Sequence, residues 1–133
     1  MGARVLCIGE CMAEICASGA GDYRLGFGGD TLNTALYLAR LLGPGHVGYV
    51  TRVGDDLYSA GMRRAWKAEG IDCALVETVA GATIGLYAIE TDARGERSFI
   101  YWRGAAPAPW RRRRWSTFRV SRLRFSLTKV ALG

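Results

Sequence analysis

The 133-residue sequence contains a single histidine, His46, and no apolar run that approaches the roughly 20 residues needed to cross a bilayer. Glu10 and Glu14 interrupt the apolar stretch near the start, which excludes a signal-peptide core there. With one histidine, the four cysteines do not complete the paired short spacings of a zinc site, so we interpret them as buried free thiols in a reducing compartment. We therefore predict a cytoplasmic protein with no membrane partner and no metal site.

Acidic residues are missing from the last 30 positions of the chain. Residues 1–103 carry ten basic and twelve acidic side chains, whereas residues 104–133 carry eight basic and no acidic ones. The net charge of +6 therefore describes the end of the chain and not its body. We divide the sequence into one folded domain, residues 1–106, and a basic tail, residues 107–133.

The tail allows two interpretations. Arginines 111–114, with Trp110 and Trp115 beside them, could bind nucleic acid through phosphate pairing and base stacking. The sudden loss of acids and the enrichment in Arg, Trp and Pro are more typical of GC-rich coding sequence read out of frame. We therefore expect an irregular tail, out of frame or disordered, and no nucleic-acid partner.

The folded domain alternates short apolar runs with amphipathic segments. The patterns predict strands at residues 5–8, 47–53 and 75–76, and helices at residues 31–42 and 57–69. Asp30 is the expected N-cap of the first helix, and Asp55-Asp56 that of the second. This βαβαβ order predicts an α/β fold with a parallel sheet and right-handed crossovers.

A different pattern follows at residues 84–103. Two β-rich runs, 84–90 and 96–103, flank a turn that contains Gly95, which predicts an antiparallel hairpin. Tyr101 and Arg103 share one face of their strand, and Tyr87 on the other arm can join them. Two phenols and a guanidinium on one face suit a polyhydroxylated ligand with a carboxylate, although a solvated edge hairpin has the same pattern.

The glycine motifs differ in their context. Residues 43–48 read G-x-G-x-x-G, but they follow a predicted helix and precede a strand, the reverse of the dinucleotide-binding arrangement. Residues 19–22, Gly-Ala-Gly-Asp, are interpreted as a turn. Gly28-Gly29-Asp30, in contrast, directly precede a helix whose free N–H groups can meet an electron-rich ligand, and Asn33 in its first turn can bind sugar hydroxyls.

Together these segments resemble the ribokinase-like (PfkB-type) carbohydrate kinases, and most closely the branch that acts on the sugar acid 2-keto-3-deoxygluconate. The resemblance covers about residues 4–106 and rests on residues 8–12, 26–35, 49–51, 54–56, 85–92 and 95–103. It implies the first half of an α/β/α layered sheet with an antiparallel β lid, transfer of phosphate from ATP with Mg²⁺, and a homodimer contact through the lid. It assigns sugar binding to Gly28, Gly29, Asp30, Asn33, Tyr87, Tyr101 and Arg103.

The sequence departs from the family beyond residue 106. It contains neither the Asp-Thr-x-Gly-Ala-Gly-Asp signature, which supplies the catalytic base and the phosphate site, nor a Walker-type motif. We therefore assign no catalytic residue and expect a truncated kinase that is inactive alone. The alternatives are a related kinase for fructose, ribose or a nucleoside, and a non-catalytic binding or dimerisation module.

Overall fold

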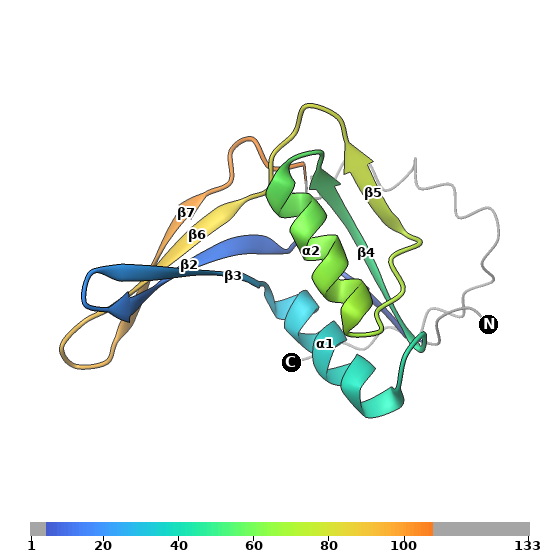
Figure 1. The fold of residues 1–133 in the computed structure, drawn as a ribbon, viewed down its shortest axis with the longest axis horizontal. Coiled ribbons are helices and arrows are strands. Elements are labelled where there is room, and N and C mark those ends of the chain that lie inside the picture. Colours follow the sequence, from blue (N-terminus) through green and yellow to red (C-terminus); the bar gives the residue numbers. More distant parts are fainter. Residues whose placement is uncertain (1–4, 108–133) are drawn as a thin grey trace, which may run out of the picture.

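The computed structural model describes residues 5–107, which form two sheets and two helices (Figure 1). In chain order the elements are β1 (Val5–Ile8), β2 (Met12–Gly19), β3 (Asp22–Gly28), α1 (Asp30–Leu42), β4 (Val47–Gly54), α2 (Leu57–Ala68), β5 (Val76–Val79), β6 (Leu86–Thr91) and β7 (Arg97–Trp102). The predicted tail, apart from Pro107, lies outside the described residues. No helix among residues 5–107 is long and apolar enough to cross a membrane.

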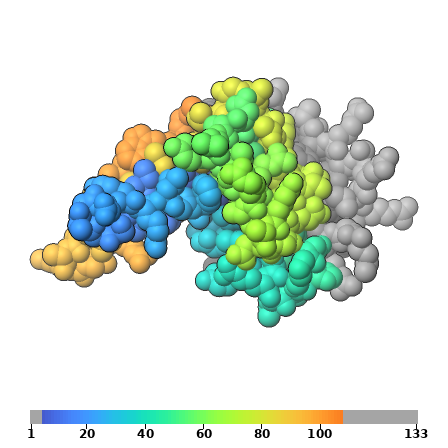
Figure 2. All heavy atoms as spheres, viewed as in Figure 1, coloured from blue at the N-terminus to red at the C-terminus, as the bar shows by residue number. Residues whose placement is uncertain are grey.

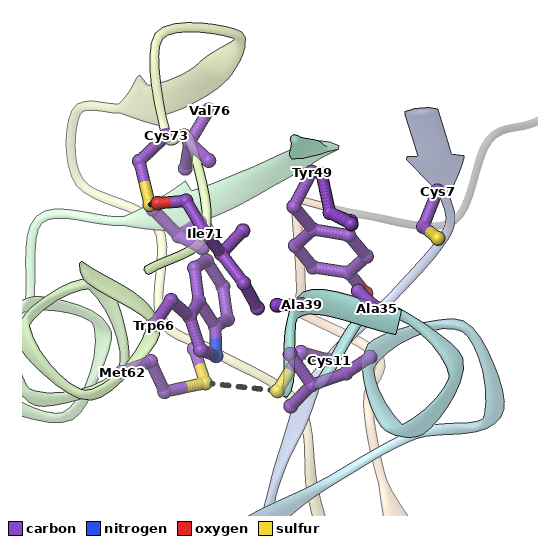
Figure 3. Close-up of a cluster of buried hydrophobic side chains, with 13 residues drawn as sticks. Cys7, Cys11, Ala35, Ala39, Tyr49, Met62, Trp66, Ile71, Cys73 and Val76 are labelled. Atoms are coloured by element: carbon purple, nitrogen blue, oxygen red, sulfur yellow. Dashed lines mark hydrogen bonds between the residues drawn. The ribbon is translucent and has the colours of Figure 1, made fainter. Parts of the chain in front are cut away.

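The first sheet is parallel, with strand order β1-β4-β5, and both helices lie over one of its faces (Figure 1). The alternating side chains of β4 that point to this face, including Tyr49 and Val53, join Leu32 of α1 and Met62 of α2 in one apolar cluster. Trp66 of α2 packs edge-on against Tyr49, with ring centroids 5.1 Å apart (Figure 3). The predicted βαβαβ unit is therefore confirmed, and we call it the core.

The ends of the two helices differ from each other. Asp56 caps α2 as predicted, because its carboxylate accepts hydrogen bonds from the backbone N–H groups of Tyr58 and Ser59. The predicted cap of α1 is wrong: Gly29 is the N-cap, and Asp30 is the first helical residue. The backbone of Gly29 has a φ of 156° and approaches the carbonyl of Glu10, a position that excludes a side chain.

The second sheet has four strands in the order β3-β2-β6-β7, and we call it the lid sheet. The predicted hairpin forms its β6 and β7, but β2 and β3 were not predicted as strands. The Gly19–Asp22 segment is a turn, as predicted, and it joins β2 to β3 with positive φ angles at Gly19, Ala20 and Gly21. Figure 2 shows the lid sheet projecting from the core as an arm.

Two further sequence predictions can be compared with the structure: the third core strand and the rejected glycine motif. The third core strand was predicted at residues 75–76 and is found at Val76–Val79. The G-x-G-x-x-G run connects the end of α1 at Leu42 to the start of β4 at Val47, so it does not open a helix. Its rejection as a dinucleotide motif agrees with that connection.

Candidate functional site

An open pocket of about 630 Å³ lies where the core meets the lid sheet. The core contributes the residues that follow β1 and the start of α1, and the lid sheet contributes one face of β2, β6 and β7. Of the residues predicted to bind sugar, the pocket is lined by Gly29, Asp30, Asn33, Tyr87, Tyr101 and Arg103. The fold thus brings together, in one pocket, residues that lie more than 70 positions apart in the sequence.

The core side of the pocket is the first turn of α1. The backbone is closely packed where this turn begins, because a Cβ at Gly29 would lie 2.5 Å from the carbonyl oxygen of Glu10. The hydroxyl of Thr31 forms a 3.0 Å hydrogen bond with the hydroxyl of Tyr49, which connects this turn to β4. Asp30 and Asn33 are exposed on this turn, so their side chains are accessible to a ligand in the pocket.

The lid side of the pocket is aromatic. Tyr87 and Tyr101 are directly paired across β6 and β7, with ring centroids 5.9 Å apart, and Phe99 stacks on Tyr101 at 6.2 Å. The predicted meeting of Tyr87 and Tyr101 on one face is therefore observed. This face therefore offers three neighbouring aromatic rings and two phenol hydroxyls, a surface on which a sugar ring can pack.

Tyr87 donates a hydrogen bond to the carboxylate of Glu14 on the neighbouring strand β2. Burial raises the pKa of the Tyr87 hydroxyl, and the nearby Glu14 raises it further, so Tyr87 stays protonated and remains a donor. Gly28, which does not line the pocket, makes this contact possible, since a Cβ there would lie 2.3 Å from the Tyr87 hydroxyl. Gly28 supports the site by leaving room for Tyr87.

Arg103 directly follows β7 and forms an ion pair with Glu10, which lies just after β1. The two side chains differ in burial: Glu10 is 12% exposed and Arg103 is 46% exposed. Burial raises the pKa of Glu10, while the positive charge of Arg103 lowers it. A half-exposed guanidinium therefore stands in the pocket beside a largely covered carboxylate.

Glu10 and Glu14 line the pocket but were not among the predicted site residues. Glu10 carried a readable signal, because it follows the predicted parallel strand at residues 5–8, and ligands of α/β sheets bind beyond the carboxyl ends of such strands. Glu14 carried none, because β2 itself was not recognised. The pairing of β2 with β6 is what places Glu14 beside Tyr87.

The described residues contain no cluster of metal ligands. Among residues 5–107, no three His, Cys, Asp or Glu side chains come together as a metal-binding group. All four cysteines are free, and three of them are buried, as predicted for structural thiols. We therefore derive no chemical step through ATP or Mg²⁺ from these residues.

The lid sheet is mixed, because β2 pairs with β6 in parallel while its other pairs are antiparallel. The parallel core, this projecting lid sheet and the glycine-led helix beside the pocket define the class of ribokinase-like α/β proteins. A family model described as pfkB family carbohydrate kinase matches residues 3–113. The chain belongs to this family.

Individual relatives agree with that assignment. The chain is 47% identical over 110 residues to 2-dehydro-3-deoxygluconokinase of Escherichia coli (strain K12), covering 81% of this chain and 35% of the relative. It is 50% identical over 103 residues to the protein of the same name from Dickeya dadantii (strain 3937), covering 76% and 33%. The structure of fructokinase from Xylella fastidiosa with bound ATP matches with a TM-score of 0.68 at 27% identity, over 77% of this chain and 31% of that one. The chain thus spans about a third of the length of these curated relatives.

Proposed function

We propose that the pocket binds the sugar acid 2-keto-3-deoxygluconate, also called 2-dehydro-3-deoxygluconate, and that the chain is the sugar-binding part of a kinase producing its 6-phosphate. Arg103 carries this proposal, because its half-exposed guanidinium stands in the pocket and can pair with a carboxylate. A neutral sugar has no carboxylate to pair with the N–H donors that Glu10 leaves free. The names of the relatives at 47% and 50% identity support the same substrate.

The pocket residues divide the work of binding by their chemistry. Asn33 offers an amide donor and acceptor to sugar hydroxyls, and the start of α1 offers its positive end to electron-rich oxygens. Tyr87 and Tyr101 cover the sugar from the lid sheet and exclude water from one side. Arg103 fixes the carboxylate end, which orients the opposite, terminal hydroxyl towards the phosphate donor.

ATP and Mg²⁺ would supply the transferred phosphoryl group and neutralise its charge, but this sequence lacks the Asp-Thr-x-Gly-Ala-Gly-Asp signature that supplies the phosphate site and the catalytic base in the family. We therefore expect the 133-residue chain alone to show no ATP-dependent phosphorylation of the sugar acid. An assay of ADP release checks this expectation. Release above background that Asn33→Ala abolishes would contradict it.

A homodimer through the lid sheet is a second part of the proposal. Ile100 and Trp102 on the edge strand β7 are 40% and 54% exposed and point away from the pocket face that carries Phe99 and Tyr101, so they form an apolar surface that a second lid sheet can cover. Sedimentation equilibrium of the chain checks it. A chain that stays monomeric at all concentrations would contradict the homodimer but not the proposed sugar site.

The direct test of the kinase uses a chimaera in which residues 3–103 replace the matching segment of the Escherichia coli relative. Arg103→Ala should raise KM for the sugar acid about tenfold or more, the effect of losing about 1.5–3 kcal/mol of binding to a charged group. KM for ATP should barely change. Arg103→Lys should recover only part of the loss, because an ammonium lacks the planar fork.

The matched control is Arg63→Ala, which removes a partly exposed arginine that donates a hydrogen bond to Thr78 away from the pocket. It should leave both KM values unchanged. A chimaera that phosphorylates fructose as well as the sugar acid would instead favour a kinase for neutral sugars. A folded chimaera that binds neither sugar would favour a non-catalytic module.

A further inference from the structure

Among the acidic side chains of residues 5–107 that line the pocket, Glu10 is the one that forms an ion pair, and its partner is Arg103. Glu10 lies in the link between β1 and β2, where the chain leaves the core for the lid sheet. Its partner Arg103 lies at the other end of the lid sheet, directly after β7. The Glu10–Arg103 pair therefore links the segment that enters the lid sheet before β2 to the segment that leaves it after β7.

The two partners differ in how firmly the fold holds them. Glu10 lies between two glycine backbones: a Cβ at Gly29 would come within 2.5 Å of its carbonyl oxygen, and one at Gly85 within 3.3 Å of its Oε1 atom. Both glycines thus let the backbone close around Glu10, whose side chain is only 12% exposed. Arg103, at 46% exposed, is a long and flexible side chain that loses rotamer freedom when it is fixed. A rigid carboxylate thus holds an otherwise mobile guanidinium.

The contact also leaves part of the guanidinium available. Glu10 binds Arg103 through Nη2 alone, so the remaining N–H donors of the planar group can meet a second carboxylate. The Oε1 atom of Glu10 is buried and has no hydrogen-bond partner among the described residues. A buried carboxylate in this condition needs the charge of Arg103. Each partner therefore has a physical reason to keep the contact.

We propose that Glu10 is a positioning residue that fixes the guanidinium of Arg103 over the pocket before an anionic sugar binds. Rotamer freedom that is lost in advance is not lost again on binding, so preorganisation strengthens the contact with the carboxylate of the ligand. Glu10 does not touch the sugar in this account and acts only through Arg103. The inference rests on the proposed function, because it assumes a sugar acid as the ligand.

The test measures binding by the complete 133-residue chain, with 2-keto-3-deoxygluconate and fructose as the charged and neutral probes. The variants are Glu10→Gln, Arg103→Gln and the double variant. The control is Glu77→Gln, which removes a carboxylate from the Arg52 ion pair outside the pocket. We expect Glu10→Gln to weaken binding of the sugar acid about fivefold and the double variant to bind as weakly as Arg103→Gln alone. Binding of fructose and the Glu77→Gln control should not change.

A second readout needs no ligand. The heteronuclear NOE of the Arg103 Nε–H group reports its motion, and it should be high in the parent chain and fall in Glu10→Gln. Glu10→Asp, which keeps the charge but shortens the side chain, should lower it as well and serves if Glu10→Gln does not fold. Three results would overturn the positioning role. They are an unchanged NOE in Glu10→Gln, tighter binding of the sugar acid by Glu10→Gln, and a Glu10→Gln substitution that weakens binding equally in the parent chain and in the Arg103→Gln chain. A parent chain that does not prefer the sugar acid over fructose would instead overturn the proposed function.

Discussion

The core and the lid sheet of this chain use aromatic side chains in opposite ways. In the core, Trp66 is 1% exposed and packs edge-on against Tyr49, whereas Trp102 at the end of the lid sheet is 54% exposed. Seven of the eight residues of β4 are buried, while all six residues of β7 are exposed. The core is therefore held by its own packing, and the lid sheet presents surfaces that suit a ligand or a second lid.

The sharpest test of this contrast replaces one tryptophan in each region. Trp66→Ala should lower the free energy of unfolding by about 3–5 kcal/mol, because it opens a large cavity among buried side chains. Trp102→Ala should cost less than about 1 kcal/mol, since about half of the residue already meets solvent. Denaturant unfolding followed by circular dichroism measures both values. Equal losses would mean that the lid sheet is packed as firmly as the core.

A smaller difference is expected between two glycines. Gly29→Ala meets both an unfavourable φ and the carbonyl of Glu10, and should cost on the order of 2–3 kcal/mol. Gly95→Ala in the lid hairpin has a φ of 83° but nothing within 4 Å of the added carbon, so about 1 kcal/mol of backbone strain is expected. The same unfolding assay compares the two variants. A larger loss for Gly95→Ala would refute the tight junction at the start of α1.

The third stability effect concerns Asp56, which links the core to the segment that enters β6 of the lid sheet. Its carboxylate caps α2 and also accepts a hydrogen bond of 3.2 Å from the backbone N–H of Ile84, just before β6. Asp56→Ala should cost about 1–2 kcal/mol at neutral pH through the lost cap. Chemical denaturation of the parent and variant chains at pH 7 checks this value.

The effect of Asp56 should also depend on pH. Burial pushes its pKa upwards, but the hydrogen bonds from Ser59, Ile84 and Tyr58 outweigh burial and hold the pKa below its ordinary value. A carboxyl with a lowered pKa stabilises the fold above its ordinary pKa and loses that contribution as pH falls through the folded value. The difference between parent and Asp56→Ala should therefore shrink below about pH 4. A difference that grows at low pH would contradict the assignment.

The same comparison explains which parts of the structure the sequence could predict. In the core, a buried helix face such as Leu32, Ala35 and Ala39 repeats at helical spacing, and Asp56 marks a helix start by its chemistry. The lid strands β2 and β3 are mostly half-buried or exposed and contain glycines at 19, 26 and 28, so no apolar alternation distinguished them from a loop.

The candidate site was also predictable only where its residues lie in a local sequence pattern. Asn33 was recognised from its place in a helix start, and Tyr87, Tyr101 and Arg103 from their places in a hairpin, because both contexts are local in sequence. Glu14 depends on the parallel pairing of β2 with β6, a contact across 73 positions that no short pattern records. Asp30 was misplaced as a cap because Gly29 approaches the carbonyl of Glu10, which is a tertiary contact.

The most direct test of the central claim, that core and lid sheet together form a pocket for a sugar acid, maps the amide chemical shifts of the 133-residue chain as 2-keto-3-deoxygluconate is added. The account predicts that Gly29 and Asn33 in the core shift together with Tyr87 and Tyr101 in the lid sheet, along one saturating curve. Glucose at the same concentrations should move these signals far less, because it offers no carboxylate to Arg103. Shifts confined to one of the two regions, or equal shifts with glucose, would contradict the account.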